Sequence, residues 1–277
     1  MVRSRLLTSV LLCFGLIVTS ALPAAASEGE YLALGDSVAF GYRGMEPPQV
    51  YANPNNFMGY PERLAQLLKL QLTNASCPGE TSGSFISATA ADNGCRQYRS
   101  LFRLHTSYTD TQLAFAIQFL RTHPDTQLVT LDLGANDVFL LEAACNNAQS
   151  CLQQQLPALL RSVAGNLNTI ETRLRTQAGY HGRLAGLTYY ATDYRDTPTV
   201  ETVGALDLTI AAETLEHGGR IADGFTAFAV ASARTQGNAC AAGLLNILPN
   251  GACDVHPSEA GHDVLARTIR AVLGGGF

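Results

Sequence analysis

YLALGDSVAFGY, residues 31–42, places a serine directly after an apolar run. Residues 31–34 are typical of a buried strand, and the apolar residues that follow Ser37 are compatible with the start of a helix. A small residue at such a strand-to-helix turn can serve the turn alone, or it can carry an exposed nucleophile. The remainder of the chain decides between these two interpretations.

The composition of the chain is that of a globular protein. Its 277 residues are 47% hydrophobic and 15% charged, the net charge is −5, and Lys69 is its one lysine. Nucleic acids and anionic membranes both require clustered positive charge, which this sequence lacks. We therefore expect no nucleic-acid partner.

Residues 1–26 have the pattern of a cleaved signal peptide. Arg3 and Arg5 precede a long apolar run, and the small residues PAAAS (23–27) follow it with an A-x-A site. The run barely reaches the length of a membrane span, and no cysteine follows the site to carry a lipid anchor. We therefore expect cleavage after Ala26. The mature chain, residues 27–277, is then exported to the extracellular space or the periplasm, without an integral membrane segment.

Six cysteines remain after Cys13 leaves with the signal peptide. An even number in an exported chain predicts disulfides. Pairing between sequence neighbours closes the shortest loops and predicts Cys77–Cys95, Cys145–Cys151 and Cys240–Cys253, although the sequence alone leaves other connectivities open. The cysteines form no C-x-x-C pair and no histidine accompanies them, so we expect no zinc site.

Short apolar runs alternate with helical patterns along residues 27–277, and no linker or repeat divides them. This alternation predicts a single domain of the three-layer α/β/α class, with a mostly parallel central sheet. The expected strands are residues 31–34, 70–73, 127–133, 183–189 and 220–223. The expected helices are residues 60–68, 112–121, 152–177, 205–216 and 259–273.

Polar segments follow three of the expected strands. GDS (35–37) follows the first strand, CPGETSGS (77–84) the second and GAND (134–137) the third. The carboxyl ends of the strands of an open parallel sheet form its ligand-binding edge. We therefore expect the three segments to meet in one site at that edge.

Four short motifs occur here in the order that is typical of the SGNH, or GDSL, hydrolase superfamily, which this chain closely resembles. They are GDS with Ser37, CPGET with Gly79, GAND with Asn136 and DVHP with His256, and they span residues 35–257. The resemblance implies a flavodoxin-like fold and a serine ester hydrolase that requires no cofactor. The stretch GDSVAFGY, the CPGETS segment and the six mature cysteines most resemble secreted bacterial lipases and esterases.

The residue types in these motifs suit acyl transfer. A serine hydroxyl needs a base to remove its proton, and histidine suits that role at neutral pH, so Ser37 is the expected nucleophile and His256 the expected base. Negative charge develops on the carbonyl oxygen, and the backbone N–H groups of Ser37 and Gly79 and the side-chain amide of Asn136 would form an oxyanion hole. The nearby Asp36 and Asp137 are expected to accept hydrogen bonds from backbone amides and to be structural.

The acid partner of the histidine departs from the family pattern, which places an aspartate three residues before the base. Cys253 occupies that position here, and Asp254 stands two residues before His256. Residues i and i+2 of an extended segment point to the same side, so we expect Asp254 to complete a catalytic triad. The sequence leaves open a Ser-His dyad, in which a main-chain carbonyl orients the histidine.

The resemblance implies an acyl ester of a lipid or of a small alcohol as the substrate. A polysaccharide O-acetyl esterase is the alternative enzyme. A non-catalytic exported binding module is the alternative of another class, and the departure at Cys253 is the one feature in its favour. Loops expected at residues 43–58, 92–108 and 190–204 would set the acyl-chain length, and the sequence does not predict the oligomeric state.

Overall fold

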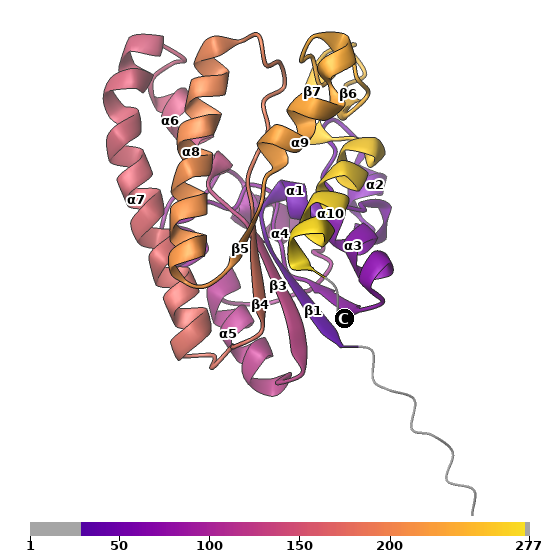
Figure 1. Cartoon of the computed structure of the whole chain (residues 1–277), viewed down its shortest axis with the longest axis vertical. Helices are drawn as coiled ribbons and strands as arrows, with labels where there is room; N and C mark the ends of the chain where they lie inside the picture. Colours follow the sequence, from indigo (N-terminus) through magenta and orange to yellow (C-terminus); the bar gives the residue numbers. More distant parts are fainter. Residues whose placement is uncertain (1–28, 275–277) are drawn as a thin grey trace, which may run out of the picture.

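The computed structural model describes residues 29–274, so the expected signal peptide, residues 1–26, lies outside the described residues. A five-stranded sheet of order β2-β1-β3-β4-β5 forms the centre of the molecule (Figure 1). Its strands are β1 (Glu30–Gly35), β2 (Gln71–Asn74), β3 (Thr126–Asp132), β4 (Arg183–Leu187) and β5 (Arg220–Ala222). All neighbouring strands are parallel, and this flavodoxin-like order makes the carboxyl ends of β1 and β3 the switch point where ligands bind.

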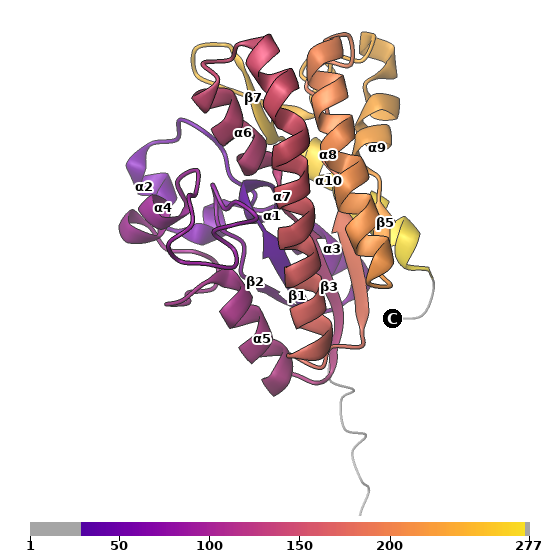
Figure 2. The same ribbon diagram turned by 90° about the vertical axis from the view of Figure 1, so that its left-hand side faces the viewer.

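Helices cover both faces of the sheet and confirm the three-layer α/β/α class (Figures 1 and 2). One layer consists of α5 (Gln112–Thr122), α7 (Gln149–Thr176) and α8 (Thr197–Glu216). The other consists of α3 (Tyr60–Leu68) and α10 (Glu259–Leu273), with α9 (Gly224–Ala231) packed against α10. Because both faces of the sheet are covered, residues 31–34 of β1 are fully buried, which is why this strand has a continuous apolar run.

The structure contains further elements for which the sequence pattern gave no bounds. They are α1 (Ser37–Phe40), α2 (Pro48–Tyr51), η1 (Pro54–Asn56), α4 (Cys95–Leu101), α6 (Ala135–Ala144), α9, η2 (Ala233–Thr235), β6 (Leu245–Ile247) and β7 (Cys253–Pro257). Most of them are too short to show a helical or alternating period. The pair β6–β7 is antiparallel and stands apart from the main sheet.

Several predicted boundaries differ from the structure, and two of them concern segments that line the site. Helix α8 begins at Thr197 rather than at residue 205, because Pro198 occupies its first turn, where a proline is well tolerated. Strand β4 ends at Leu187 rather than at residue 189, because the N–H of Tyr189 turns away to donate to Asp207 of α8 (2.8 Å). The side chain of Tyr189 consequently lies beyond the carboxyl edge of the sheet.

Three disulfides join the described cysteines as Cys77–Cys95, Cys145–Cys151 and Cys240–Cys253. The first closes the loop after β2, and the third ties the start of β7 to the segment that precedes β6. Both therefore restrain segments that lie beyond the sheet. No helix between residues 29 and 274 is long and apolar enough to cross a membrane.

Candidate active site

The structure brings the four motifs together at the carboxyl edge of the sheet. Ser37 is the first residue of α1, directly after β1, and Asn136 lies in the first turn of α6, after β3. Gly79 lies in the loop after β2, and His256 comes from β7, outside the main sheet. Three of the segments thus follow adjacent parallel strands, whereas the fourth reaches the site from the separate hairpin.

The side chains of Ser37, His256 and Asp254 form a continuous hydrogen-bonded series. The Nε2 atom of His256 lies 3.0 Å from Ser37 Oγ, and its Nδ1 lies 2.9 Å from Asp254 Oδ1. Strand β7 is extended, so both of its side chains point to the same side, as the spacing of two residues requires. The geometry therefore places a carboxylate, not a main-chain carbonyl, at the histidine ring.

A second contact fixes the carboxylate of Asp254. Its Oδ2 accepts a hydrogen bond from the backbone N–H of Gly44 at 3.1 Å. Burial alone would raise the pKa of Asp254, but the hydrogen bonds from His256 and from this N–H outweigh it, and the pKa lies below its usual value. The carboxylate is therefore ionised at neutral pH, held at both oxygens, and able to stabilise a positive charge on the ring.

The expected oxyanion donors face a common space beside Ser37. The backbone N–H groups of Ser37 and Gly79 make no hydrogen bond within the described part of the chain. Gly79 has a φ of 84°, and a Cβ there would lie 2.4 Å from the carbonyl oxygen of Asn93, so only glycine fits. The amide of Asn136 is fixed at both ends, donating to Asp36 (3.1 Å) and accepting from Asn93 Nδ2 (2.8 Å). One N–H of this amide is left for a ligand.

The two aspartates beside the motifs have structural contacts. Asp36 caps α1 by accepting from the N–H of Val38 at 2.9 Å. Asp137 accepts from the backbone N–H of Ser82 at 2.8 Å and from its hydroxyl at 2.7 Å, which joins α6 to the segment that carries Gly79. Both carboxyls therefore hold the segments that carry the motif residues in place.

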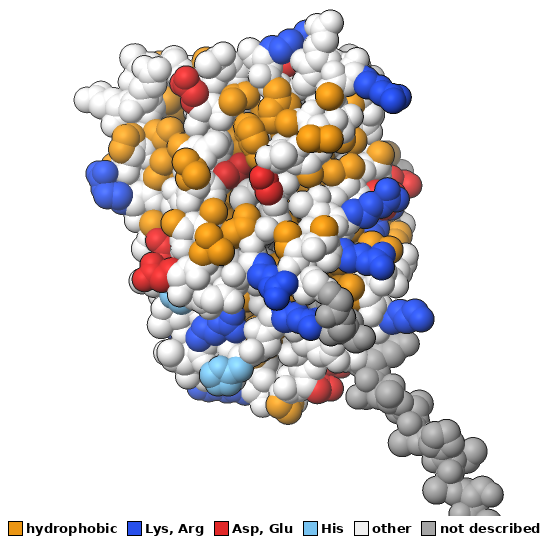
Figure 3. All heavy atoms as spheres, in the orientation of Figure 1, with side chains coloured by type: hydrophobic (Ala, Val, Ile, Leu, Met, Phe, Trp, Pro, Cys, Tyr) orange, Lys and Arg blue, Asp and Glu red, His pale blue; other side chains and the backbone are white. Residues whose placement is uncertain are grey.

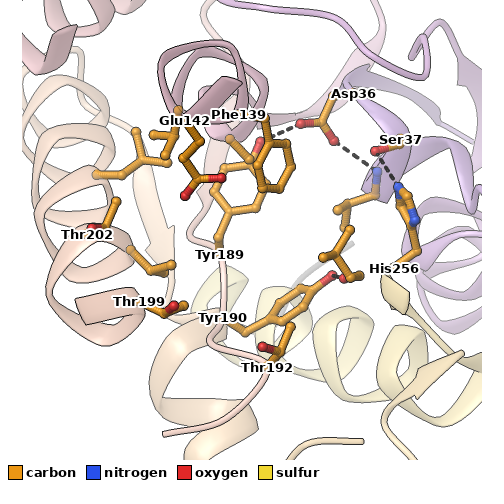
Figure 4. Close-up of a pocket in the computed structure, with 16 residues that line it drawn as sticks. Asp36, Ser37, Phe139, Glu142, Tyr189, Tyr190, Thr192, Thr199, Thr202 and His256 are labelled. Atoms are coloured by element: carbon orange, nitrogen blue, oxygen red, sulfur yellow. Dashed lines mark hydrogen bonds between the residues drawn. The ribbon is translucent and has the colours of Figure 1, made fainter. Parts of the chain in front are cut away.

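Two cavities flank Ser37 and His256, and Phe139 and Val255 line both. The first, of about 260 Å³, lies between α6 and α8 and is drawn in Figure 4. Its walls are largely apolar and consist of Val138, Phe139, Tyr189, Tyr190, Val203 and Leu206, with Glu142, Thr199 and Thr202 at the side away from Ser37 and Thr192 beside Tyr190. The second, of about 450 Å³, lies against α4 and includes the polar side chains of Asn93, Gln97, Tyr98 and Asn136. Both cavities are thus lined by Ser37 and His256.

The described residues offer no set of free side chains that could bind a metal ion. Cys77, Glu80 and Cys95 are the one group of potential ligands among residues 29–274, and the disulfide between the two cysteines occupies both sulfur atoms.

Sequence reasoning missed three residues that support the site: Asn93, Asp132 and Tyr189. Asn93 holds the Asn136 amide, and Tyr189 donates to Asp36 at 2.7 Å. Asn93 and Tyr189 lie in loops whose conformation no local pattern specifies. Asp132 could have been found, because an acidic residue inside the apolar strand QLVTLDL has no place in a buried sheet unless it has a partner.

The fold and the site together define a class of enzyme. A parallel α/β sheet with a serine, a histidine and a carboxylate in contact at its carboxyl edge has the arrangement that hydrolases on several unrelated folds use for acyl transfer. The sequence profile of the GDSL-like Lipase/Acylhydrolase family matches residues 33–264, so the chain belongs to that family and is a carboxylic ester hydrolase.

Solved structures share the SGNH hydrolase fold with this chain. Phospholipase A1 from Streptomyces albidoflavus NA297 has a TM-score of 0.58 at 16% identity, covering 89% of this chain and 100% of its own. An extracellular lipase from Streptomyces rimosus has a TM-score of 0.58 at 15% identity, covering 88% and 99%. An acetylxylan esterase from Geobacillus stearothermophilus has a TM-score of 0.54 at 16% identity, covering 90% and 96%. None of the curated protein sequences matches this chain.

Proposed function

We propose that the protein cleaves carboxylic acyl esters through an acyl-enzyme on Ser37. The observation that carries this proposal is the series of contacts from Ser37 through His256 to Asp254, at 3.0 and 2.9 Å. A histidine in this position can accept the proton of the serine hydroxyl, and the carboxylate at Nδ1 keeps the ring in the required tautomer.

Acylation begins when Ser37 Oγ attacks the carbonyl carbon and its proton passes to Nε2 of His256. The carbonyl oxygen becomes an oxyanion, which the N–H groups of Ser37 and Gly79 and the free N–H of Asn136 stabilise. Loss of one such donor typically lowers the rate by ~10²–10³. His256 then donates its proton to the departing alcohol, and the acyl group remains on Ser37.

In deacylation, water takes the place of the serine as the attacking group, and Ser37 becomes the leaving group. Water donates a proton to His256 as it attacks the acyl-enzyme, the same donors stabilise the second oxyanion, and the proton returns to Ser37 Oγ as the carboxylic acid leaves. Asp254 remains ionised throughout and stabilises the imidazolium that forms in each half-reaction.

We assign the acyl chain to the apolar cavity between α6 and α8. Burial of each CH₂ group contributes ~0.8 kcal/mol, and this cavity offers an apolar wall directly beside Ser37. Apolar side chains also gather on the upper half of the adjoining face, around the end toward which the strands point (Figure 3). The substrate class supported best is therefore an ester of an apolar acyl chain, as in a lipid or a small-alcohol ester.

A polysaccharide O-acetyl esterase is the second candidate. The observation that favours it is the larger cavity, whose asparagine, glutamine and tyrosine side chains can hydrogen-bond a hydroxylated alcohol moiety. In this alternative the acetyl group would leave most of the apolar cavity unused.

The first experiment measures hydrolysis of p-nitrophenyl esters by the wild type and by Ser37→Ala. We expect Ser37→Ala to lose activity by at least ~10³-fold while its circular dichroism spectrum is unchanged. An inactive wild type, or full activity in Ser37→Ala, would refute the proposed function.

The second experiment distinguishes the two substrates. With the apolar cavity as the acyl site, kcat/KM should rise ~3- to 4-fold per added CH₂ until the cavity is filled. Val203→Trp, which places a ring in this cavity, should shift the optimum to shorter chains. Leu208→Trp, on the same helix but 74% exposed, is the matched control. Preference for an acetylated sugar over every longer ester would favour the deacetylase instead.

We also propose that the protein is exported. Three disulfides require an oxidising compartment, and residues 1–26 have the signal-peptide pattern. Amino-terminal sequencing of the protein recovered outside the cytoplasm should begin at Ser27. An uncleaved cytoplasmic protein with reduced cysteines would contradict this proposal.

A further inference from the structure

Two aspartates lie in contact in the buried layer directly behind Ser37. Asp36 and Asp132 are each 1% exposed, and their carboxyl groups are in hydrogen-bonding contact. Asp132 stands opposite Gly35 in the β1–β3 register, and a Cβ on Gly35 would lie 2.3 Å from Asp132 Oδ1. The glycine that begins the GDS motif therefore leaves the space that the carboxyl of Asp132 occupies.

The partners of this pair are neutral donors. The ion pairs of residues 29–274 that involve lysine, arginine or histidine lie elsewhere. Two ionised carboxylates in contact without a cation would repel each other in a buried site, whereas one shared proton converts the repulsion into a hydrogen bond. The pair therefore carries one proton and one negative charge.

The hydrogen bonds indicate which carboxyl holds the proton. Asp36 accepts from three groups: Val38 N (2.9 Å), Tyr189 OH (2.7 Å) and Asn136 Nδ2 (3.1 Å). Asp132 accepts from Tyr60 OH (2.7 Å) at Oδ1, and the backbone N–H of Ala39 also lowers its pKa, while its buried Oδ2 has no hydrogen-bond partner as a carboxylate oxygen. More donors favour the ionised form, so Asp36 is the carboxylate and Asp132 is the acid.

We propose that Asp132 is a positioning residue: its neutral carboxyl donates to Asp36, and this acid pair holds the Asn136 amide in the oxyanion hole. The proposal rests on the oxyanion role of Asn136 in the proposed function. Asp36 restrains one N–H of that amide, so the other N–H keeps its direction toward the carbonyl oxygen. If Asp132 were ionised or lacked a donor, Asp36 would shift, and Asn136 and Tyr189 would shift with it.

Burial supports this protonation state. It raises the pKa of Asp132 well above its usual value, and the neighbouring Asp36 raises it further. Burial also raises the pKa of Asp36, but the hydrogen bonds from Val38 and Tyr189 act in the opposite direction. The titratable groups that face the pair are Tyr31 of β1, Tyr60 of α3, Tyr189 and Tyr190 after β4, Asp137 of α6 and His256 of β7.

The first test is spectroscopic and does not depend on activity. The infrared difference spectrum between wild type and Asp132→Asn at pH 8 should contain the C=O band of a protonated carboxyl group. Asp125→Asn, an exposed position at the opposite end of β3, is the control and should not remove this band. Absence of the band from the wild type would overturn the proposal, whether or not the protein is an esterase.

The second test is kinetic. Asparagine at position 132 can still donate to Asp36 and accept from Tyr60, so Asp132→Asn should keep kcat within ~3-fold of the wild type. Asp132→Leu has a similar size but no donor, and should lower kcat by ~10- to 100-fold with little change in KM. A loss in Asp132→Asn equal to that in Asp132→Leu would overturn the proposal. If Asp132→Leu does not fold, the activity of Asp132→Asn and the infrared band decide whether the proposal holds.

Discussion

Replacing Asp254 with asparagine tests the acid of the proposed triad, because the surrounding contacts dictate how the new amide must lie. The backbone N–H of Gly44 needs an acceptor at the position of Oδ2, 3.1 Å away. The oxygen of the introduced amide would therefore face Gly44, and its NH₂ group would face Nδ1 of His256. That ring nitrogen must then be unprotonated, which places the proton on Nε2, the atom 3.0 Å from Ser37 Oγ.

A histidine with its proton on Nε2 cannot accept the serine proton. In an established Ser-His-Asp enzyme the corresponding exchange lowers kcat by ~10⁴, which corresponds to about 5 kcal/mol of transition-state stabilisation. We expect a loss of that order here, since Asp254 is held at both oxygens and the amide has no second orientation that satisfies Gly44.

The assay is kcat for p-nitrophenyl ester hydrolysis at pH 8, with the melting temperature measured on the same preparations. Asp125→Asn, at the opposite end of the sheet, is the matched control and should retain full activity. A loss of less than ~10-fold in Asp254→Asn would refute the triad and support a Ser-His dyad. A large loss accompanied by a large fall in melting temperature would indicate disrupted folding rather than the wrong histidine tautomer.

Two further predictions concern Gly79 and Asp207. Gly79→Ala should lower kcat by ~10- to 100-fold, because the new Cβ would lie 2.4 Å from Asn93 O and would displace an oxyanion donor. Gly165→Ala, with open space around its Cβ, is the control. Equal activity in both variants would contradict this reasoning. Burial raises the pKa of Asp207 to about 8, so the folded protein holds a proton that the unfolded chain releases above pH ~4. Stability from this group is present below pH ~4 and is lost as the pH rises to about 8. Unfolding in urea should show that the free energy of unfolding of Asp207→Asn rises relative to that of the wild type, by up to ~1.4 kcal/mol per pH unit over that window. A difference between the two proteins that does not change with pH would refute this prediction.

Much of the scaffold could be predicted from local patterns. The apolar run before Ser37 predicted β1, and the amphipathic stretches at α3 and α10 predicted these helices with the bounds that the structure has. Such elements are long enough, and buried on a definite enough face, for their periodicity to appear in the sequence. The mostly parallel sheet then followed from the alternation of strands and helices.

The elements that shape the site were harder to predict. Helix α6 carries apolar residues on most of its sides, so the sequence shows no amphipathic pattern that would predict a helix there. Its residues Val138 and Phe139 nevertheless line the apolar cavity. The β6–β7 hairpin has strands too short for an alternating pattern to be recognised. The sequence could place His256 ahead of the last helix, but it could not predict the strand that aims its ring at the serine.

The sequence by itself determined which groups are available for chemistry: a serine after a buried strand, a glycine and an asparagine after the next two, and a late histidine. Motif order and strand placement depend on neighbours along the chain, so they are readable without coordinates. Only the tertiary structure decided that Asp254 reaches the histidine ring and that Asp36 and Asp132 share a buried layer. The second of these contacts joins residues far apart in sequence, as does the contact of Asp36 with Tyr189 at a separation of 153 positions, whereas the first needs β7 to lie extended beside Ser37 and Gly44. Such distances and burial arise from packing of the whole domain, and no local pattern encodes them.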